Sequence, residues 1–587
     1  MILAATIALA LILVGAGLGA DRLAAGRVSP DIEAPAHALI AGWAILSLVA
    51  LACALLGARL TLPVTAVGLF GLAGYLLSPR NTAIVLRLAA AWLIVAPLLL
   101  IASTTSPFMA DEFTHWLPNT RFLLERDSFS AAADPNIWSG APGYPPAVPL
   151  IGYAIGRSAG SGSELAPKIF CVLLAAGFGL LLAGTLRRRL PSTAAIAAGV
   201  AFATVLNPFF DPRIAFTSYA DVPSGFVLAF CVQACWQATE NPDRHTALRS
   251  SATAILLVLL RETNIVLLAG LAAGLLLMGR RGWWPFVGLS VPGGSAFVLW
   301  RFFLWRESIP PTALPRPLAE WDWTAPWSVV KAVLTDRLAG NPVVGILGVL
   351  LLAGLLATFM SRWRRTPAAL RRLLLLSSTT AAVWIAFLAW SYVAVFTPQL
   401  ATQGNSAWRY LSELGPLFIL VFFSLLAAWL PDRSAPPVFA NSAAIRTAAA
   451  VVAFLVPAAL IALTRDHWRV ECRYPDVAAV RRIAASLDRA MVGNQTINVV
   501  HLSDGLSLAR QLDYELHRPL GASVGVKVPG EAHQAGFLLD LAQLDRQGWS
   551  DISSQASGSL SRWDGGKWDL VSTFALKDDR DRCDSAQ

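Results

Sequence analysis

Long apolar segments recur along this chain, and no other feature of the sequence limits its possible folds so strongly. The segment from Leu86 to Ala102 is one of them and contains a single charged residue. A helix needs roughly 20 mostly apolar residues to cross about 30 Å of hydrocarbon. The chain of 587 residues is 56% hydrophobic and only 14% charged, with a mean hydropathy of +0.57, which is far more apolar than a soluble domain. The sequence therefore predicts a polytopic α-helical membrane protein.

We expect about 14 membrane-spanning helices of this length. The first apolar segment lacks the basic residues that open a signal peptide, so we interpret it as a span. The expected spans lie near residues 2–20, 37–57, 60–78, 82–103, 165–186, 192–208, 221–239, 248–262, 264–280, 283–304, 342–361, 372–396, 411–430 and 446–464.

The distribution of charge predicts how these spans are oriented. The formal net charge is +9, but the basic residues form short clusters between spans, which indicates membrane topology and excludes a nucleic-acid partner. The connections between spans alternate between short basic ones and longer ones that hold most of the acids. The longer, acidic connections are 104–164, 209–220, 305–341 and 397–410. The positive-inside rule then predicts a multi-pass protein of the inner (plasma) membrane, with the acidic loops and the tail at 465–587 on the extracytoplasmic, periplasmic side.

The polar tail has the pattern of a small folded domain. Thr496–Leu502 reads as a strand, and Leu506–Leu516 has helical spacing of apolar residues, so we expect an α/β domain that caps the membrane part. No glycine-rich phosphate motif occurs in it. The six cysteines lack metal-ligand spacing, so no zinc or redox site is indicated; Cys472 and Cys583, the two in the tail, form either a disulfide or free thiols.

The loop at 104–164 opens with the most conspicuous polar group of the chain. Asp111, Glu112 and His115 follow directly on an apolar span. Ionisable groups at the hydrocarbon boundary are candidates for a functional site. Later in the same loop, Tyr144 precedes two prolines that delay the start of the next helix.

Three further positions carry possible chemistry, and two interpretations stay open at each. Asp221, before Val222-Pro223, either caps a helix or faces the same cavity as Asp111. Arg261 and Glu262 interrupt an apolar stretch and either neutralise each other or leave Arg261 to bind an anion at a break between two short helices. Arg409 either extends toward the membrane surface or binds a phosphate with its planar fork.

Taken together, these motifs resemble the GT-C superfamily of membrane glycosyltransferases, and within it the branch of the protein O-mannosyltransferases and the lipid A aminoarabinose transferase. The resemblance rests on the order and sidedness of Asp111-Glu112, Tyr144-Pro145-Pro146, Tyr219-Ala220-Asp221-Val222-Pro223, the broken helix pair and Arg409-Tyr410. It covers residues 82–464. We therefore expect extra N-terminal helices at 1–81, a GT-C-like module at 82–464 and the extracytoplasmic domain at 465–587.

The resemblance implies an inverting glycosyltransferase of the cell envelope. Such an enzyme moves a hexose or pentose from a polyprenyl-phosphate carrier to a glycan, lipid or protein acceptor on the outer face. Asp111 would be the general base, Glu112 would orient donor or acceptor, and Asp221 would be a second acid. The residues that would bind substrate are His115, Tyr144, Arg261, Glu262, Arg409 and Tyr410. His115 stands where related loops often carry Arg or Tyr, and Tyr144 where the aminoarabinose transferase branch tends to have Lys, so the sugar and the acceptor stay open, as does any need for a divalent metal.

The chemistry is also reasonable from the residues alone. A lipid phosphate is a good leaving group, so one carboxylate that accepts the acceptor's proton and cations that hold the phosphate suffice. A glycoside hydrolase needs two carboxylates.

Two other kinds of protein are alternatives. A lipid or glycolipid transporter, or flippase, would place its ionisable groups near the bilayer midplane and often shows internal repeats, whereas the acids here gather outside the spans. A scaffold that binds envelope partners through its tail would leave Asp111 and Glu112 without a role.

Overall fold

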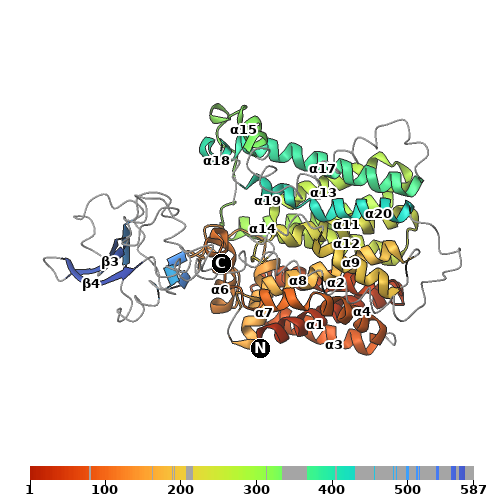
Figure 1. The fold of residues 1–587 in the computed structure, drawn as a ribbon, viewed down its shortest axis with the longest axis horizontal. Coiled ribbons are helices and arrows are strands. Elements are labelled where there is room, and N and C mark those ends of the chain that lie inside the picture. The colour runs from red at the N-terminus through yellow and green to blue at the C-terminus, as the bar shows by residue number, and fades with distance from the viewer. Residues whose placement is uncertain are drawn as a thin grey trace. The chain divides into compact units, whose positions relative to one another are not determined.

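In the computed structural model, most of the described residues up to 429 lie in helices (Figure 1). The structure describes residues 1–77, 81–160, 163–187, 190, 192–205, 216–311, 314–332, 367–402 and 406–429, and beyond these 455, 480, 481, 484, 511, 512, 514, 515 and four short strands. Its helices are α1 (Ile2–Ala25), α2 (Ala34–Leu55), α3 (Thr61–Leu77), α4 (Asn81–Ile94), α5 (Ala96–Ala102), α6 (Leu117–Arg126), α7 (Ala147–Ala159), α8 (Ala166–Leu186), α9 (Ser192–Val205), α11 (Asp221–Glu240), α12 (Arg244–Leu260), α13 (Ile265–Leu277), α14 (Arg280–Arg306), α15 (Ala325–Ala332), α17 (Ala368–Ala394), α18 (Pro398–Thr402), α19 (Ala407–Ser412) and α20 (Gly415–Trp429).

The chain divides into two compact units. The first comprises Met1–Thr104, Thr120–Pro135 and Gly143–Leu463, and the second comprises Thr105–Asn119, Asn136–Pro142 and Thr464–Gln587. The second unit therefore joins two pieces of the acidic loop to the C-terminal segment.

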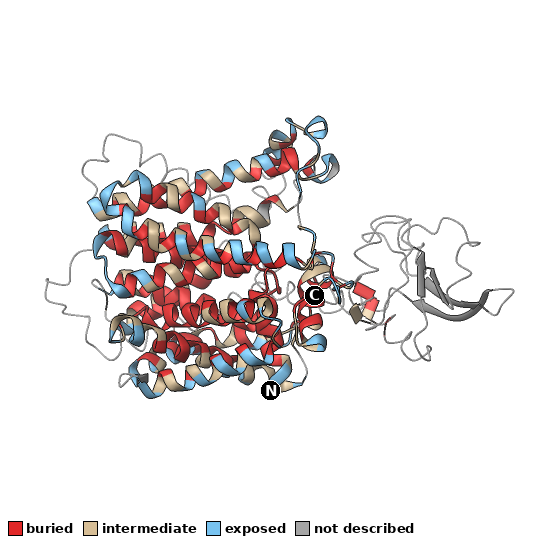
Figure 2. Ribbon diagram, turned by 180° about the vertical axis from the view of Figure 1, so that it is seen from behind, coloured by how far each residue is buried: buried red, intermediate tan, exposed pale blue. Residues whose placement is uncertain are grey.

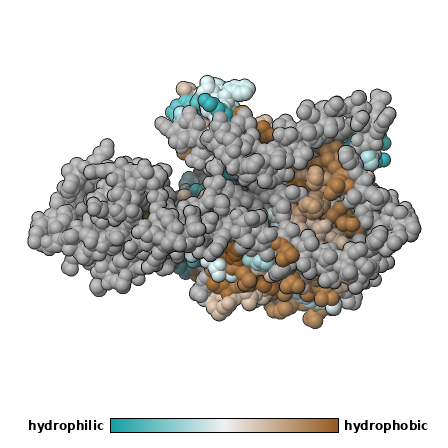
Figure 3. All heavy atoms as spheres, in the orientation of Figure 1, coloured by the Kyte–Doolittle hydropathy of each residue, from teal (hydrophilic) through white to brown (hydrophobic). Residues whose placement is uncertain are grey.

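The first unit is a bundle of helices with a continuous buried interior (Figure 2). Glycines let its N-terminal helices come into backbone contact: a Cβ on Gly42 of α2 would lie 1.9 Å from the carbonyl oxygen of Leu13 in α1. On the outside of the bundle, large apolar side chains are exposed, including Leu62, Leu69 and Leu76 along α3. Figure 3 shows apolar patches, in brown, on the described part of the face in view. Such a surface suits hydrocarbon and not water.

Six of the described helices are long and apolar enough to cross a membrane, or up to seven if the bent pair Thr61–Leu77 and Thr82–Ile94 counts as one span. The six are Ile2–Ala25, Ala34–Leu55, Ala166–Leu186, Arg280–Arg306, Ala368–Ala394 and Arg409–Ala428, each at a position where the sequence predicts a span. The spans expected near 342–361 and 446–464 lie outside the described residues. A multi-pass membrane protein is thus confirmed, whereas the total of about 14 spans stays a prediction.

The acidic loop contains helices of its own, none of membrane length among its described residues. A π-helix at Glu112–Trp116 leads into α6, and α7 begins at Ala147 directly after the proline pair, as predicted. The interruption predicted at residue 261 is also present, because α12 ends at Leu260, a 3₁₀ turn follows at Glu262–Asn264, and α13 begins at Ile265.

The C-terminal segment contains a four-stranded sheet in the order β1-β2-β3-β4. Its strands are β1 (Ile497–Val500), β2 (Phe537–Asp540), β3 (Ser557–Trp563) and β4 (Trp568–Ala575). β1 pairs with β2 in parallel, and the other two pairs are antiparallel. The strand predicted at 496–502 is therefore confirmed. Most of the predicted helix at 506–516, and both Cys472 and Cys583, lie outside the described residues, so the α/β domain stays a prediction.

Candidate functional site

A cluster of charged side chains forms where α11 begins and α12 ends. Asp221 is the first residue of α11, and Arg261 is the extended residue that ends α12, with φ −157° and ψ 135°. The break is held from inside by the fully buried Asn264, whose amide donates to Ser224 Oγ at 2.7 Å and to the carbonyl oxygen of Leu257 at 2.8 Å. These bonds fix the Arg261 backbone relative to α11.

Arg261 lies at the centre of this cluster. Its Nη1 donates to Asp221 Oδ1 at 2.6 Å and to Glu413 Oε1 at 3.0 Å, and its guanidinium lies over the Tyr410 ring, 4.5 Å from the centroid. The residue is only 7% exposed. Since a buried guanidinium is tolerated only with partners, both carboxylates contribute to holding this cation in the bundle.

Arg409, in the short helix α19, adds a second cation. Its Nε lies 3.4 Å from Asp221 Oδ1, its Nη2 donates to the Tyr410 hydroxyl at 3.1 Å, and its guanidinium lies over the rings of Tyr219 and Tyr410 at 4.9 and 5.0 Å. The two arginines therefore lie on the same tyrosine ring and pair with the same aspartate. Two guanidinium groups so placed are suited to bind an oxyanion such as a phosphate.

The sequence analysis missed Glu413, the fourth member of the cluster. It is fully buried between α19 and α20, and its Oε2 has no hydrogen-bond partner among the residues that the structure describes. The signal was present, because an acid four residues after Arg409 interrupts an apolar span, and such residues are functional candidates.

The structure corrects one interpretation at each of three positions. Asp221 does not cap α11: the N-cap is Ala220, no side chain caps the helix, and the carboxylate pairs with arginine instead. Arg261 and Glu262 do not neutralise each other, because Glu262 pairs with Arg301 of α14. Arg409 does not extend away from the bundle, because its side chain is only 15% exposed and paired with Asp221.

Two more polar side chains belong to the same unit. Tyr144 is close enough to Arg261 to interact with its charge. Lys168, in the first turn of α8, is fully buried, which the sequence analysis also missed. A buried lysine is rare and marks a position of functional interest.

Asp111 and Glu112, the acids that open the loop, belong to the second unit. Glu112 is fully buried, and its Oε2 accepts hydrogen bonds from the backbone amides of Phe108 at 2.8 Å and Met109 at 3.1 Å. Asp111, directly before the π-helix, is partly exposed. His115 packs against Gly140, where a Cβ would lie 3.1 Å from the imidazole.

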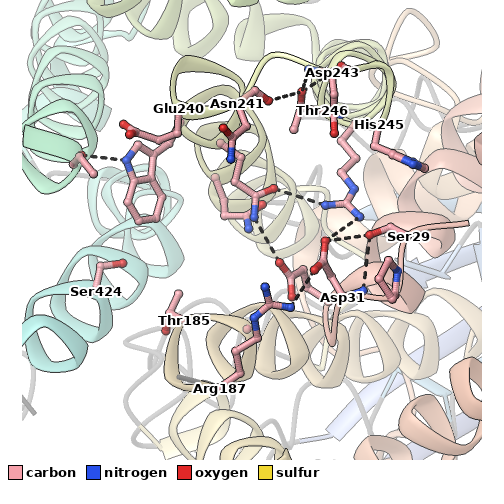
Figure 4. A pocket seen from close by; sticks show the side chains of 18 of the residues that line it. Ser29, Asp31, Thr185, Arg187, Glu240, Asn241, Asp243, His245, Thr246 and Ser424 are labelled. Carbon is pink, nitrogen blue, oxygen red and sulfur yellow. Dashed lines mark hydrogen bonds and ion pairs between the residues drawn. The ribbon is translucent and has the colours of Figure 1, made fainter. Parts of the chain in front are cut away.

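A polar cavity of about 690 Å³ lies at the other end of α11, about 30 Å from Asp221 along the helix (Figure 4). Asp31 is central to it, with Arg187 Nη1 at 2.7 Å and Arg249 Nη2 at 3.7 Å. Although burial opposes it, the hydrogen bond from Ser29 and the two arginine charges hold the pKa of Asp31 below its ordinary value. Burial, and then the charge of Asp31, raises the pKa of the neighbouring Glu33.

No group of three or more His, Cys, Asp or Glu side chains that could hold a metal occurs among the residues that the structure describes. The cluster around Arg261 is instead a mixed set of two cations and two acids.

No protein-family model and no curated protein sequence matches the chain. Among solved structures, it is similar to ArnT, the lipid A aminoarabinose transferase, from Cupriavidus metallidurans. The structure of ArnT bound to undecaprenyl phosphate has 15% identity and a TM-score of 0.45 over 79% of this chain and 93% of that one. The apo structure has 16% identity and a TM-score of 0.45 over 78% and 93%.

A second similar structure is the Archaeoglobus fulgidus oligosaccharyltransferase tethered with an acceptor peptide that contains the NVT sequon. It has 12% identity and a TM-score of 0.37 over 76% of this chain and 64% of that one. Both proteins are members of the GT-C superfamily, the superfamily that the sequence motifs resemble.

Proposed function

We propose that the chain is a membrane glycosyltransferase. It moves a sugar, with inversion, from a polyprenyl-phosphate-linked donor to a glycan, lipid or protein acceptor on the outer face of the membrane. The observation that carries the proposal is the pair of arginines, Arg261 and Arg409, gathered over Tyr410 at one end of an apolar helix bundle. A lipid phosphate has an anionic head for the arginines and an apolar tail for the hydrocarbon around the bundle.

The arginines would stabilise the carrier phosphate as it leaves. Charge develops on this phosphate as the bond to the sugar breaks, and pre-placed guanidinium groups interact with it more strongly than with the bound donor. Because the leaving phosphate needs no proton, the reaction requires only a base for the acceptor hydroxyl.

We assign the base to Asp111. The Glu112 carboxylate accepts two backbone hydrogen bonds, which supports a role for Glu112 in shaping the loop, whereas Asp111 is partly exposed. Asp221 would hold both arginines in place, and Tyr144, Tyr410 and His115 would contact donor or acceptor. Glu262 is not included, since it pairs with Arg301.

The proposal includes the sidedness predicted from charge, with the loop at 104–164 and the C-terminal segment outside the inner membrane. The Arg261 cluster would then open toward the outer leaflet, and the cavity around Asp31 would lie at the cytoplasmic end of the bundle.

Mass spectrometry of the lipids that copurify with the protein tests this function. We expect a polyprenyl phosphate, with or without a sugar, in the wild type and much less of it in the Arg409→Ala variant. Retention of bulk phospholipids only, in equal amounts in both proteins, would contradict a polyprenyl-phosphate donor.

A further inference from the structure

The cluster around Arg261 is balanced in charge before any ligand arrives. Asp221 and Glu413 carry two negative charges when ionised, and Arg261 and Arg409 carry two positive charges. The four side chains are 3%, 0%, 8% and 15% exposed. Because an uncompensated charge is costly in such a desolvated place, the added charge of a lipid phosphate needs compensation.

The phosphate would also compete with groups that already occupy Arg261. The proposed function brings the phosphate to the guanidinium whose Nη1 donates to both Asp221 and Glu413. A carboxylate that gives up this contact while still ionised would be left buried and unpaired.

Of the two carboxylates, Glu413 is held less closely by the arginines. Asp221 Oδ1 lies 2.6 Å from Arg261 Nη1 and 3.4 Å from Arg409 Nε. Glu413 makes the longer contact with Arg261, at 3.0 Å, and its Oε2 has no hydrogen-bond partner among the described residues. Neutralising Glu413 therefore removes less stabilisation than neutralising Asp221.

The surroundings of Glu413 contain few other groups that could take up a proton. The described charged side chains that act on it are Asp221 of α11, which is also within hydrogen-bond reach of it, Arg261 at the end of α12 and Arg409 of α19. Two tyrosines lie near the arginines: Tyr410, over which the Arg261 guanidinium lies, and Tyr392 of α17, which interacts with the charge of Arg409. The helix that follows, α20, carries no titratable residue.

We propose that Glu413 occupies the position of the donor phosphate on Arg261 in the empty protein and takes up one proton from solvent when a lipid phosphate binds. The inference rests on the proposed function. One O–H bond forms on the Glu413 carboxyl, the contacted N–H of Arg261 turns to the phosphate, and the total charge of the site is unchanged. Donor affinity then falls about tenfold per pH unit wherever Glu413 of the empty protein is ionised.

Calorimetry with a non-titrating lipid tests the proposal. The probe is the methyl diester of undecaprenyl phosphate, which keeps one negative charge because it lacks the second ionisation of a phosphate monoester. Binding to the full-length protein in nanodiscs is measured at several pH values up to about pH 9 in two buffers of different ionisation enthalpy. We expect uptake that rises with pH toward about one proton per lipid in the wild type.

The Glu413→Gln variant keeps the shape of the side chain but has no ionisable carboxyl. We expect it to take up no proton and to bind the diester at about pH 8 about tenfold or more tightly than the wild type. Glu240→Gln, which removes an ion-paired glutamate at the other end of α11, is the matched control and should behave as the wild type.

The measurements separate the role of Glu413 from the proposed function of the protein. Binding to the wild type without proton uptake, or proton uptake that persists in Glu413→Gln and disappears in Asp221→Asn, would overturn the role of Glu413. If Glu413→Gln does not fold, the proton count of the wild type and a protonated-carboxyl band in its infrared difference spectrum still decide. If the diester fails to bind the wild type at any pH, the proposed function fails instead.

Discussion

At the scale of single residues, the two arginines of the candidate site differ in how much they contribute to folding stability. Arg261 is the partner of two buried carboxylates, whereas Arg409 lies at their edge and contacts two tyrosine rings. Removing Arg261 therefore leaves buried charges without a partner, which costs several kcal/mol of folding stability. Arg409 can be removed with less damage to the fold.

We accordingly predict that Arg409→Ala weakens binding of a polyprenyl phosphate by about 1.5–3 kcal/mol, the size of a charge-assisted hydrogen bond. Arg409→Lys should restore only part of the affinity, since lysine has no planar fork. Calorimetric titration of both variants measures this, with Arg301→Ala as the control, an arginine that pairs with Glu262 outside the cluster. Unchanged affinity in Arg409→Ala would place the phosphate elsewhere.

The cavity at the opposite end predicts a pH effect on stability. The pKa of Glu33 is raised by burial and by Asp31, so its contribution is complete below the ordinary value of 4.5 and is lost as the pH rises through the higher value of the folded protein. Glu33→Gln should therefore raise the melting temperature at about pH 8 and change it little at about pH 4.

Asp31→Asn is the matched comparison, because the pKa of Asp31 is lowered whereas that of Glu33 is raised. The pKa of Asp31 is lowered, so its contribution is present at neutral pH and is lost as the pH falls through the folded value. The asparagine variant should be less stable than the wild type at neutral pH. Thermal melts in detergent measure the stability of both variants. Equal melting curves for Glu33→Gln and the wild type at about pH 8 would count against a raised pKa of Glu33.

At the scale of elements, the site depends on how closely α11 approaches the start of α20. A Cβ on Gly225 would lie 2.9 Å from the carbonyl oxygen of Glu413 and 3.2 Å from the Pro416 ring. The absence of a side chain at Gly225 thus sets the position of Glu413 beside Asp221.

Gly225→Ala should therefore destabilise the protein by about 1–3 kcal/mol, the usual cost of overpacking, and lower the affinity for the lipid phosphate as well. Gly288→Ala is the control, since that glycine of α14 has nothing within 4 Å of an added Cβ. It should be neutral or stabilising by up to about 1 kcal/mol, because alanine favours helix. Equal melting temperatures for the two variants would contradict this close approach.

The sequence predicted the elements of the site better than the contacts between them. The helix break at Arg261 followed from a polar pair inside an apolar stretch, and the start of α7 followed from paired prolines. The partners of Arg261 did not follow, because Asp221 and Glu413 are 40 and 152 residues away along the chain. Only tertiary packing shows that Glu262, the adjacent acid, pairs with Arg301 instead.

At the scale of the whole molecule, apolar segments predicted a membrane protein correctly because hydrocarbon sets their length independently of tertiary contacts. The number of spans and their sidedness depend on segments outside the described residues, so they stay predictions. So does the state of Cys472 and Cys583.

Thiol labelling of intact cells tests the sidedness. We expect a membrane-impermeant reagent to reach Cys583 without permeabilisation, either directly or, if a disulfide to Cys472 forms, only after reduction. Such a disulfide would close a loop of about 110 residues and stabilise the segment by up to about 4–5 kcal/mol. Cys171, Cys231 and Cys235 are buried and give little background, whereas Cys53 is partly exposed and is first replaced by alanine. Labelling of Cys583 only after permeabilisation would reverse the predicted orientation.

Release of the lipid carrier tests the central claim, transfer of a sugar from a polyprenyl phosphate, most directly. The purified protein is placed in vesicles made from a total lipid and envelope extract of the cells that produce it, and free polyprenyl phosphate is followed by mass spectrometry. We predict that it accumulates with the wild type and at least about 100-fold more slowly with Asp111→Asn, which cannot accept the proton of the acceptor. Movement of the intact sugar lipid between leaflets without release of the carrier would show a flippase, and carrier release at the wild-type rate by Asp111→Asn would remove Asp111 as the base.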